Sequence, residues 1–218
     1  MTGRGRAAVA ACLVALLPGG VAAVFAAPLP IEAVVLHRGH GMGHGGAITV
    51  AYRARVLYGD GRYTTDAKDA LGASPRIDGR WQREGGGYLL QPDKAGAKPE
   101  RIDAKMKARP ASRGATLEGE YRSLSGVGAT GMGVPVVAAA RALHFRKDGS
   151  LTANASASAG TGDTVATGHR GAAARYALNG WTITMTGAGG RADTRLFYFF
   201  PDGDDVIGVG GSTLSRRR

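Results

Sequence analysis

The sequence predicts a mainly β protein in which antiparallel meanders form one or two small sheets or a small barrel, joined by long flexible loops. Apolar and polar residues alternate with period two from 48 to 58, a pattern typical of a half-buried strand. Asp-Gly pairs recur between apolar segments and favour tight hairpin turns. Evidence for helices is poor, because the best candidate, 134–143, contains Pro135 and the β-branched Val136 and Val137.

The composition limits both the core and the chemistry. Of the 218 residues, 36 are glycine, and alanine is as frequent, so the apolar core must be thin. Cys12 is the single cysteine, which excludes an intramolecular disulfide and a cysteine-based zinc or iron–sulfur site. The formal net charge is +11. A basic protein outside the cytoplasm is attracted to anionic envelope polymers, such as lipopolysaccharide and teichoic acid, to phospholipid head groups and to extracellular DNA. The other interpretation is that the charge only aids solubility.

Residues 1–26 are predicted to be a secretory signal peptide. Arg4 and Arg6 precede the apolar stretch 7–17, and small residues follow, which favours cleavage after Ala26. The apolar stretch is too short to span a bilayer, and no later run is long enough, so we expect no transmembrane helix in the mature chain. The alternative is a lipobox at 9–12, which would anchor the protein by a lipid on Cys12. In either case we expect an exported protein, periplasmic or extracellular.

The first half of the mature chain is predicted to contain two segments. Residues 27–46 end in a run of glycines and histidines and are expected to be a flexible segment. Residues 47–105 are expected to form a first β meander. Its opening strand, 48–58, turns at Gly59-Asp60-Gly61 into a second strand that begins near Arg62.

The second half is predicted to repeat this plan. Residues 106–116 form a linker, 117–215 a second β meander, and 216–218 a basic tail. Aromatic strands and glycine turns follow one another in a similar order in both halves, which suggests two similar meanders. Residues 153–174 consist mostly of Ala, Ser, Gly and Thr, and their small apolar area predicts a disordered loop.

The second half, about residues 117–215, also resembles a loose group of uncharacterised exported bacterial β-rich proteins. The resemblance implies a β fold with glycine-turned hairpins, and it implies no catalytic residue. It is carried by turn and aromatic positions: 117–122, Leu143-His144-Phe145 with Asp148-Gly149, Tyr176 with Gly180-Trp181, and Phe199-Phe200-Pro201 with Gly210-Gly211.

Three of the five histidines, His37, His40 and His44, lie within eight residues, with Met42 between them. Imidazole binds copper and zinc, and a thioether suits reduced copper, so this segment is a candidate metal site. The other interpretation is a glycine linker in which the histidines have no role.

Five aromatic residues are candidates for a ligand surface. Several lie beside arginines, an arrangement that stacks on sugars or bases while supplying positive charge. The competing expectation is that aromatic residues on strands face the core. The candidates are Trp81, Tyr88, Tyr121, Tyr176 and Trp181.

The remaining motifs do not predict catalysis. Residues 126–131 match the spacing G-x-G-x-x-G, but a buried strand before them and a helix after them are not predicted, so nucleotide binding is not expected. The sequence contains no G-x-S-x-G, H-E-x-x-H or P-loop motif. We therefore expect a non-enzymatic binding or structural module of the periplasm or cell envelope. The alternatives are a secreted hydrolase with an unrecognised polar site and a His-rich copper or zinc protein.

Overall fold

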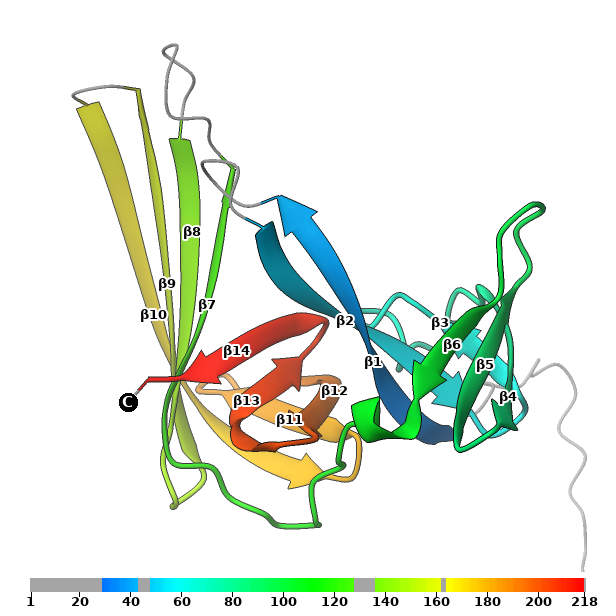
Figure 1. Cartoon of the computed structure of the whole chain (residues 1–218). Coiled ribbons are helices and arrows are strands. Elements are labelled where there is room, and N and C mark those ends of the chain that lie inside the picture. Colours follow the sequence, from blue (N-terminus) through cyan, green and yellow to red (C-terminus); the bar gives the residue numbers. More distant parts are fainter. Residues whose placement is uncertain (1–28, 43–47, 128–135, 162–163, 218) are drawn as a thin grey trace, which may run out of the picture.

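The computed structural model describes residues 29–42, 48–127, 136–161 and 164–217, and it confirms the predicted fold class. These residues form two antiparallel β assemblies, a six-stranded sheet followed by a closed barrel (Figure 1). Within these ranges, no helix has the length and apolar character that a membrane span requires.

The six-stranded sheet contains β1 (Ile31–Met42), β2 (Ile48–Tyr58), β3 (Arg62–Thr64), β4 (Gly79–Glu84), β5 (Gly87–Pro92) and β6 (Glu100–Asp103). The strands are hydrogen-bonded in chain order, and the sheet curls until β6 approaches β1. The predicted strand 48–58 is confirmed as β2. The predicted hairpin is confirmed as well: Gly61 has a φ of 83°, and its N–H donates to the carbonyl oxygen of Tyr58.

The prediction of a flexible segment at 27–46 is wrong for Ile31–Met42, which form β1. This strand pairs with β2 along almost its whole length, from Ile31 opposite Tyr58 to Met42 opposite Ile48. Ala33 and Val35 face the core inside the sheet, while Val34 and Leu36 face a second core on the other side. Burial on both faces at 33–36 and pairing with β2 along the rest of the strand therefore order a segment whose glycines alone favour flexibility.

The barrel contains β7 (Gly119–Val127), β8 (Val136–Phe145), β9 (Ser150–Thr161), β10 (Thr164–Asn179), β11 (Thr182–Gly187), β12 (Ala192–Phe200), β13 (Gly203–Val209) and β14 (Ser212–Arg216). It closes because β14 pairs with β7 and β9 pairs with β10. Apolar side chains fill its interior. The largest are Tyr121, Phe145, Tyr176, Phe197 and Phe199.

Two further expectations are corrected in the barrel. The predicted disordered loop 153–174 lies in β9 and β10, apart from residues 162 and 163, which lie outside the described part. The best helix candidate, 134–143, falls largely in strand β8. The reason is the same for both, because each strand lies between two others: β8 pairs with β7 and β9, and β9 pairs with β8 and β10. Backbone groups therefore find partners on both sides, which does not depend on large side chains. As Figure 1 shows, β7 to β10 extend well beyond the short strands β11 to β14.

The predicted linker, 106–116, connects the two assemblies by backbone hydrogen bonds. The N–H of Ala108 donates to Val34 of β1, and Arg109 exchanges two bonds with Phe199 of β12. Ala111 exchanges two more with Gly180. A short 3-10 helix, Ala104–Met106, precedes this stretch. The linker is therefore an ordered connection that is bonded to both assemblies.

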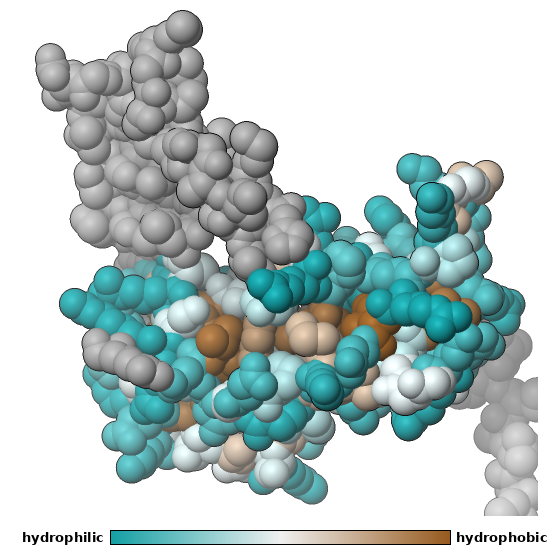
Figure 2. Space-filling model, in the orientation of Figure 1, coloured by the Kyte–Doolittle hydropathy of each residue, from teal (hydrophilic) through white to brown (hydrophobic). Residues whose placement is uncertain are grey.

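A shared core joins the sheet to the outside of the barrel. Leu196, Tyr198 and Phe200, on the outer face of β12, pack with Val34 and Val56. We call this cluster the shared core; its buried members are Val34, Leu36, Ala54, Val56, Tyr58, Ala67, Ala70, Ala108, Leu196, Tyr198 and Phe200. Figure 2 shows the surface of the molecule, where hydrophilic residues dominate and apolar residues appear in a band across the middle of the face.

Candidate functional site

The five aromatic ligand candidates do not lie on one surface. Tyr121 and Tyr176 are buried inside the barrel, and Tyr88 is buried inside the sheet. Trp81 is partly buried against Tyr88, with ring centroids 5.9 Å apart, and Trp181 packs on the shared core. The expectation of a common stacking surface is therefore corrected, because alternation along the strands directs the tyrosines into two separate cores.

Tyr176 has a structural role in the barrel. Its hydroxyl accepts a hydrogen bond from the N–H of Leu117 at 2.7 Å and lies 3.0 Å from the carbonyl oxygen of the same residue. Burial raises the pKa of Tyr176. This side chain fixes the segment that leads into β7, so it is unavailable to a ligand.

The histidine cluster is only partly described. His37 lies in β1, with its Nδ1 atom 2.5 Å from Oε1 of Glu100 on β6. His40 is paired through its backbone with Val50, while its side chain and the whole of His44 lie outside the described residues. Among the described residues, no group of three or more His, Cys, Asp or Glu side chains is placed to hold a metal ion. The copper or zinc site stays a prediction.

A cleft at one end of the barrel brings together residues that are far apart in the sequence. Its volume is about 480 Å³, within the usual range for small-molecule sites. We call it the mouth cleft, and it is lined by Lys68, Arg141, Asp193, Thr194, Arg195, Gly210 and Ser212.

Strand alternation explains why charged residues reach this end of the barrel. Leu143 and Phe145 of β8 face the barrel core, so Arg141, two residues earlier, lies on the same inner face. Asp193 and Arg195 likewise precede the core residue Phe197 on β12. The apolar filling of the barrel is thus followed by a charged layer at its mouth.

The long strands identify which end of the barrel this is. β10 pairs with β11 only from Ala174 to Asn179, whereas it pairs with β9 from Thr164 onward. The mouth cleft therefore lies where β11 to β14 end and β7 to β10 continue. Gly210 and Gly211, with φ of 54° and 81°, form the tight turn between β13 and β14 at the same end.

Lys68 enters the mouth cleft from the first assembly. It lies in the loop between β3 and β4. Two other residues of this loop, Ala67 and Ala70, are buried in the shared core. The hydroxyl of Tyr58 donates to the carbonyl oxygen of Ala70 at 3.0 Å, which holds this loop in place. A Cβ atom built on Gly211 would lie 3.4 Å from Cγ of Lys68, so the lysine stem passes close to the β13–β14 turn.

The charges in the mouth cleft do not cancel. Arg195 is paired with Asp193, whose Oδ2 atom lies 2.6 Å from Nη2 of the arginine. Among the described residues, neither the Arg141 guanidinium nor the Lys68 ammonium has an ion-pair or hydrogen-bond partner. Burial and the nearby positive charge of Arg195 lower the pKa of Arg141, against the opposing effect of Asp193. Two cationic groups are therefore left over, one of them partly buried.

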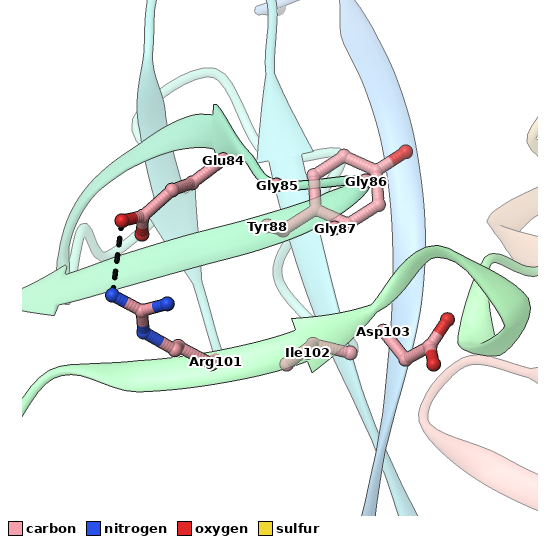
Figure 3. Close-up of a pocket in the computed structure, with 8 residues that line it drawn as sticks. All are labelled: Glu84, Gly85, Gly86, Gly87, Tyr88, Arg101, Ile102 and Asp103. Carbon is pink, nitrogen blue, oxygen red and sulfur yellow. Dashed lines mark hydrogen bonds and ion pairs between the residues drawn. The ribbon is translucent and has the colours of Figure 1, made fainter.

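A second cleft lies at the turn between β4 and β5. Its main charged groups, Glu84 and Arg101, neutralise each other, with 2.9 Å between Oε1 and Nη2. Figure 3 shows this pair facing each other from β4 and β6, while the Tyr88 ring points away from it. The pairing leaves the carboxylate of Asp103 as the remaining charge of the lining, so this cleft is a weaker candidate for an anionic ligand.

A third cleft lies between β2 and the end of the barrel. Tyr52 and Phe200 form its apolar side, with ring centroids 5.3 Å apart. Asp202, Asp204 and Asp205 provide carboxylates, but Asp204 is held by Arg109 at 2.7 Å. The mouth cleft is therefore the stronger candidate, because its surplus charge lies partly inside the barrel.

No protein-family model matches this chain, and no curated protein or solved structure is significantly similar to it. Sequence reasoning did not identify the mouth cleft, since Lys68, Arg141 and Arg195 come from three distant segments. The one local signal is the spacing of Arg141 from Leu143 and Phe145, which places an arginine on the face of a strand that is otherwise apolar.

Proposed function

We propose that this protein is an exported, non-enzymatic binding module of the periplasm or cell envelope, and that its partners are anionic envelope polymers. The observation that carries the proposal is the mouth cleft, where Lys68 and Arg141 present positive charge without a carboxylate partner among the described residues. The signal-peptide pattern of residues 1–26 supports export. The formal net charge of the full chain is +11, and only Arg4 and Arg6 of it lie in residues 1–26, so the exported protein stays strongly basic, which supports long-range attraction to polyanions.

The form of the barrel favours binding at its end. Aromatic and aliphatic side chains pack the interior, so a ligand meets the charged layer at the mouth. The cleft residues stand on strands and on a loop tied to the shared core, which preorganises their backbones before a partner arrives. A scaffold of this kind binds without a large ordering cost.

The binding test compares anionic polymers with a neutral one. The exported protein, purified from cells that express the full chain, is applied to immobilised lipopolysaccharide, teichoic acid and neutral dextran. We expect retention on the two anionic polymers at about 0.01 M salt and a marked loss at about 0.15 M, because salt screens exposed charges. Equal behaviour on dextran, or hydrolytic turnover of either polymer, would overturn the proposal.

Export is tested separately on the same cells. We expect the protein in the periplasmic or extracellular fraction, with Ala27 as its N-terminal residue. Recovery from the cytoplasm with residues 1–26 retained contradicts export. Incorporation of radiolabelled palmitate would instead indicate a lipid anchor on Cys12.

A further inference from the structure

We infer that the mouth cleft binds a single phosphate-type dianion, with Arg141 as its anchor and Lys68 as its second cation. The inference rests on the proposed binding function and names the chemical group that the site takes. The class covers both free phosphate and a phosphomonoester at the end of a polymer or small molecule.

The first argument is the charge balance of the cleft. Asp193 and Arg195 neutralise each other through a 2.6 Å contact, so the surplus is the pair of positive charges on Arg141 and Lys68. A phosphomonoester carries between about −1.5 and −2 at neutral pH and matches this surplus. A carboxylate carries one charge and would leave one cation unbalanced.

The second argument is the position of Arg141. It stands on the inner face of β8, directly beyond Leu143, and no acceptor in the described part of the chain satisfies its guanidinium. A partly buried cation that forms no ion pair among the described residues, and whose charge Asp193 offsets only in part, destabilises the folded protein. An anion that entered the mouth would remove this cost and form charge-assisted hydrogen bonds with the planar guanidinium.

The third argument is the shape of the cleft and its remaining donors. Ser212, at the start of β14, lines the cleft and carries a hydroxyl that can donate to an oxyanion. Lys68 reaches the cleft from the other assembly, beside Gly211. An oxyanion held here would contact both the barrel and the loop of the first sheet, so binding should stabilise the whole molecule.

The test uses small anions at constant ionic strength. Inorganic phosphate, glycerol 3-phosphate and acetate are titrated into the purified exported protein by calorimetry, and the melting temperature is recorded in parallel. We expect saturable binding of one phosphate or glycerol 3-phosphate per chain, a rise in melting temperature with either, and neither effect with acetate. Binding of the ester alone assigns the site to esterified phosphate, and comparable binding of both assigns it to the free group as well.

Matched variants identify the anchor. Arg141→Gln should weaken phosphate binding about tenfold or more, because a charge-assisted hydrogen bond is lost. Lys68→Gln should weaken it less. Arg113→Gln removes the same charge from an exposed position outside the cleft and should leave the dissociation constant unchanged.

Stability without anions separates a binding role from a structural one. If Arg141 is kept for an anion, Arg141→Gln should melt at or above the wild-type temperature in phosphate-free buffer, because an uncompensated charge has been removed. Should that variant fail to fold, phosphate binding by Lys68→Gln tests the site instead, since the Lys68 side chain is exposed and its replacement should not affect folding. A dissociation constant equal to that of the wild type would then overturn the phosphate site.

Failure of this inference is distinguishable from failure of the proposed function. No saturable phosphate binding by the wild type, equal losses in Arg141→Gln and Arg113→Gln, or equal affinity for acetate each overturns the phosphate site. Retention on anionic polymers can persist in all three cases, and it then supports binding through general surface charge. Saturable phosphate binding without polymer retention supports the site and removes the polymers as partners.

Discussion

At the scale of single residues, the fold depends on a few close contacts, of which the contact between Gly208 and the ring of Tyr198 is the tightest example. Gly208 of β13 lies opposite Tyr198 of β12, and the tyrosine ring covers it. A Cβ atom at this glycine would lie 2.0 Å from Cζ of the ring. Burial raises the pKa of Tyr198 to about 12, which reflects how completely this side chain is enclosed. Glycine is required here for space, since its backbone conformation is not restricted to glycine.

We therefore expect Gly208→Ala to lower the free energy of unfolding by about 1–3 kcal/mol, because the ring or the strand must shift. Chemical denaturation followed by circular dichroism measures the change. Gly187→Ala is the matched control, since that strand residue has no atom within 4 Å of the new Cβ. Equal effects of the two substitutions would contradict the steric explanation.

A carboxylate in the first sheet gives a pH-dependent prediction. Asp78 is partly buried, which raises its pKa, but bonds from the N–H and hydroxyl of Thr65 and from Arg76 outweigh burial and lower the pKa overall. Its contribution to stability is therefore complete above the unfolded-state pKa of about 3.9 and is lost as the pH falls below it.

Asp78→Asn should be less stable than the wild type at neutral pH by about 1–3 kcal/mol. The difference should shrink as the pH falls below about 4, where the wild-type carboxylate becomes protonated. Urea unfolding at several pH values measures it. Asp202→Asn is the control, because its exposed carboxylate accepts no hydrogen bond in the described part of the chain. A difference that does not vary with pH would show that Asp78 acts by packing alone.

At the scale of elements, neighbouring strands override weak local preferences. β9 contains mostly small residues, yet it pairs with β8 from Phe145 opposite Leu151 and with β10 from Arg175 opposite Ser150. A strand between two partners has its backbone groups bonded on both sides. The order of β9 therefore depends on its position in the sheet rather than on its side chains.

Hydrogen exchange tests this order directly. Amides of β9 from Thr152 to Gly160 should exchange slowly, because they are bonded to one neighbour or the other. The exposed turn at 94–99 provides an internal reference for fast exchange. Exchange of β9 as fast as this turn would restore the interpretation of 153–174 as a loop.

At the scale of the whole molecule, the shared core makes the sheet and the barrel depend on each other. Tyr198 and Phe200 of the barrel are buried against Val34 and Val56 of the sheet. The linker adds backbone bonds from Ala108 and Arg109 to the two assemblies. Separating them would expose an apolar face on each, so we expect them to unfold together.

The two tryptophans report on the two assemblies. Trp81 lies in the sheet, where its Nε1 donates to the carbonyl oxygen of Tyr58 at 2.9 Å, and Trp181 lies beside the barrel strand β11. Urea unfolding of Trp81→Phe and of Trp181→Phe is followed by the fluorescence of the remaining tryptophan. Each variant should show a single transition, and the two urea midpoints should differ only by the effect of each mutation on stability. Circular dichroism should give the same midpoint as fluorescence in each variant.

Tyr198→Ala extends the same experiment to the shared core. Introduced into both single-tryptophan proteins, it should lower both midpoints together, by about 3 kcal/mol or more in unfolding free energy. A loss confined to the Trp181 signal would show that the barrel unfolds independently of the sheet.

Local sequence patterns determined the parts of this protein in which the side chains themselves specify the backbone. Alternation over 48–58 predicted β2 with its bounds, because period two matches the pleat of a strand. The Asp60-Gly61 pair predicted the hairpin, because a tight turn needs the positive φ that glycine adopts. The sequence likewise supplied the surplus of basic residues on which the proposed function rests.

Tertiary structure alone decided what depends on partners distant in the chain. β1 and β9 are ordered by the strands beside them. The glycines of β1 and the alanines and serines of β9 form no local pattern that predicts pairing with those strands. The aromatic residues Tyr88, Tyr121 and Tyr176 entered two cores because register determines which face of a strand is buried. The mouth cleft exists because closure of the barrel brings Arg141 and Arg195 to one end and the shared core holds the loop of Lys68 beside them.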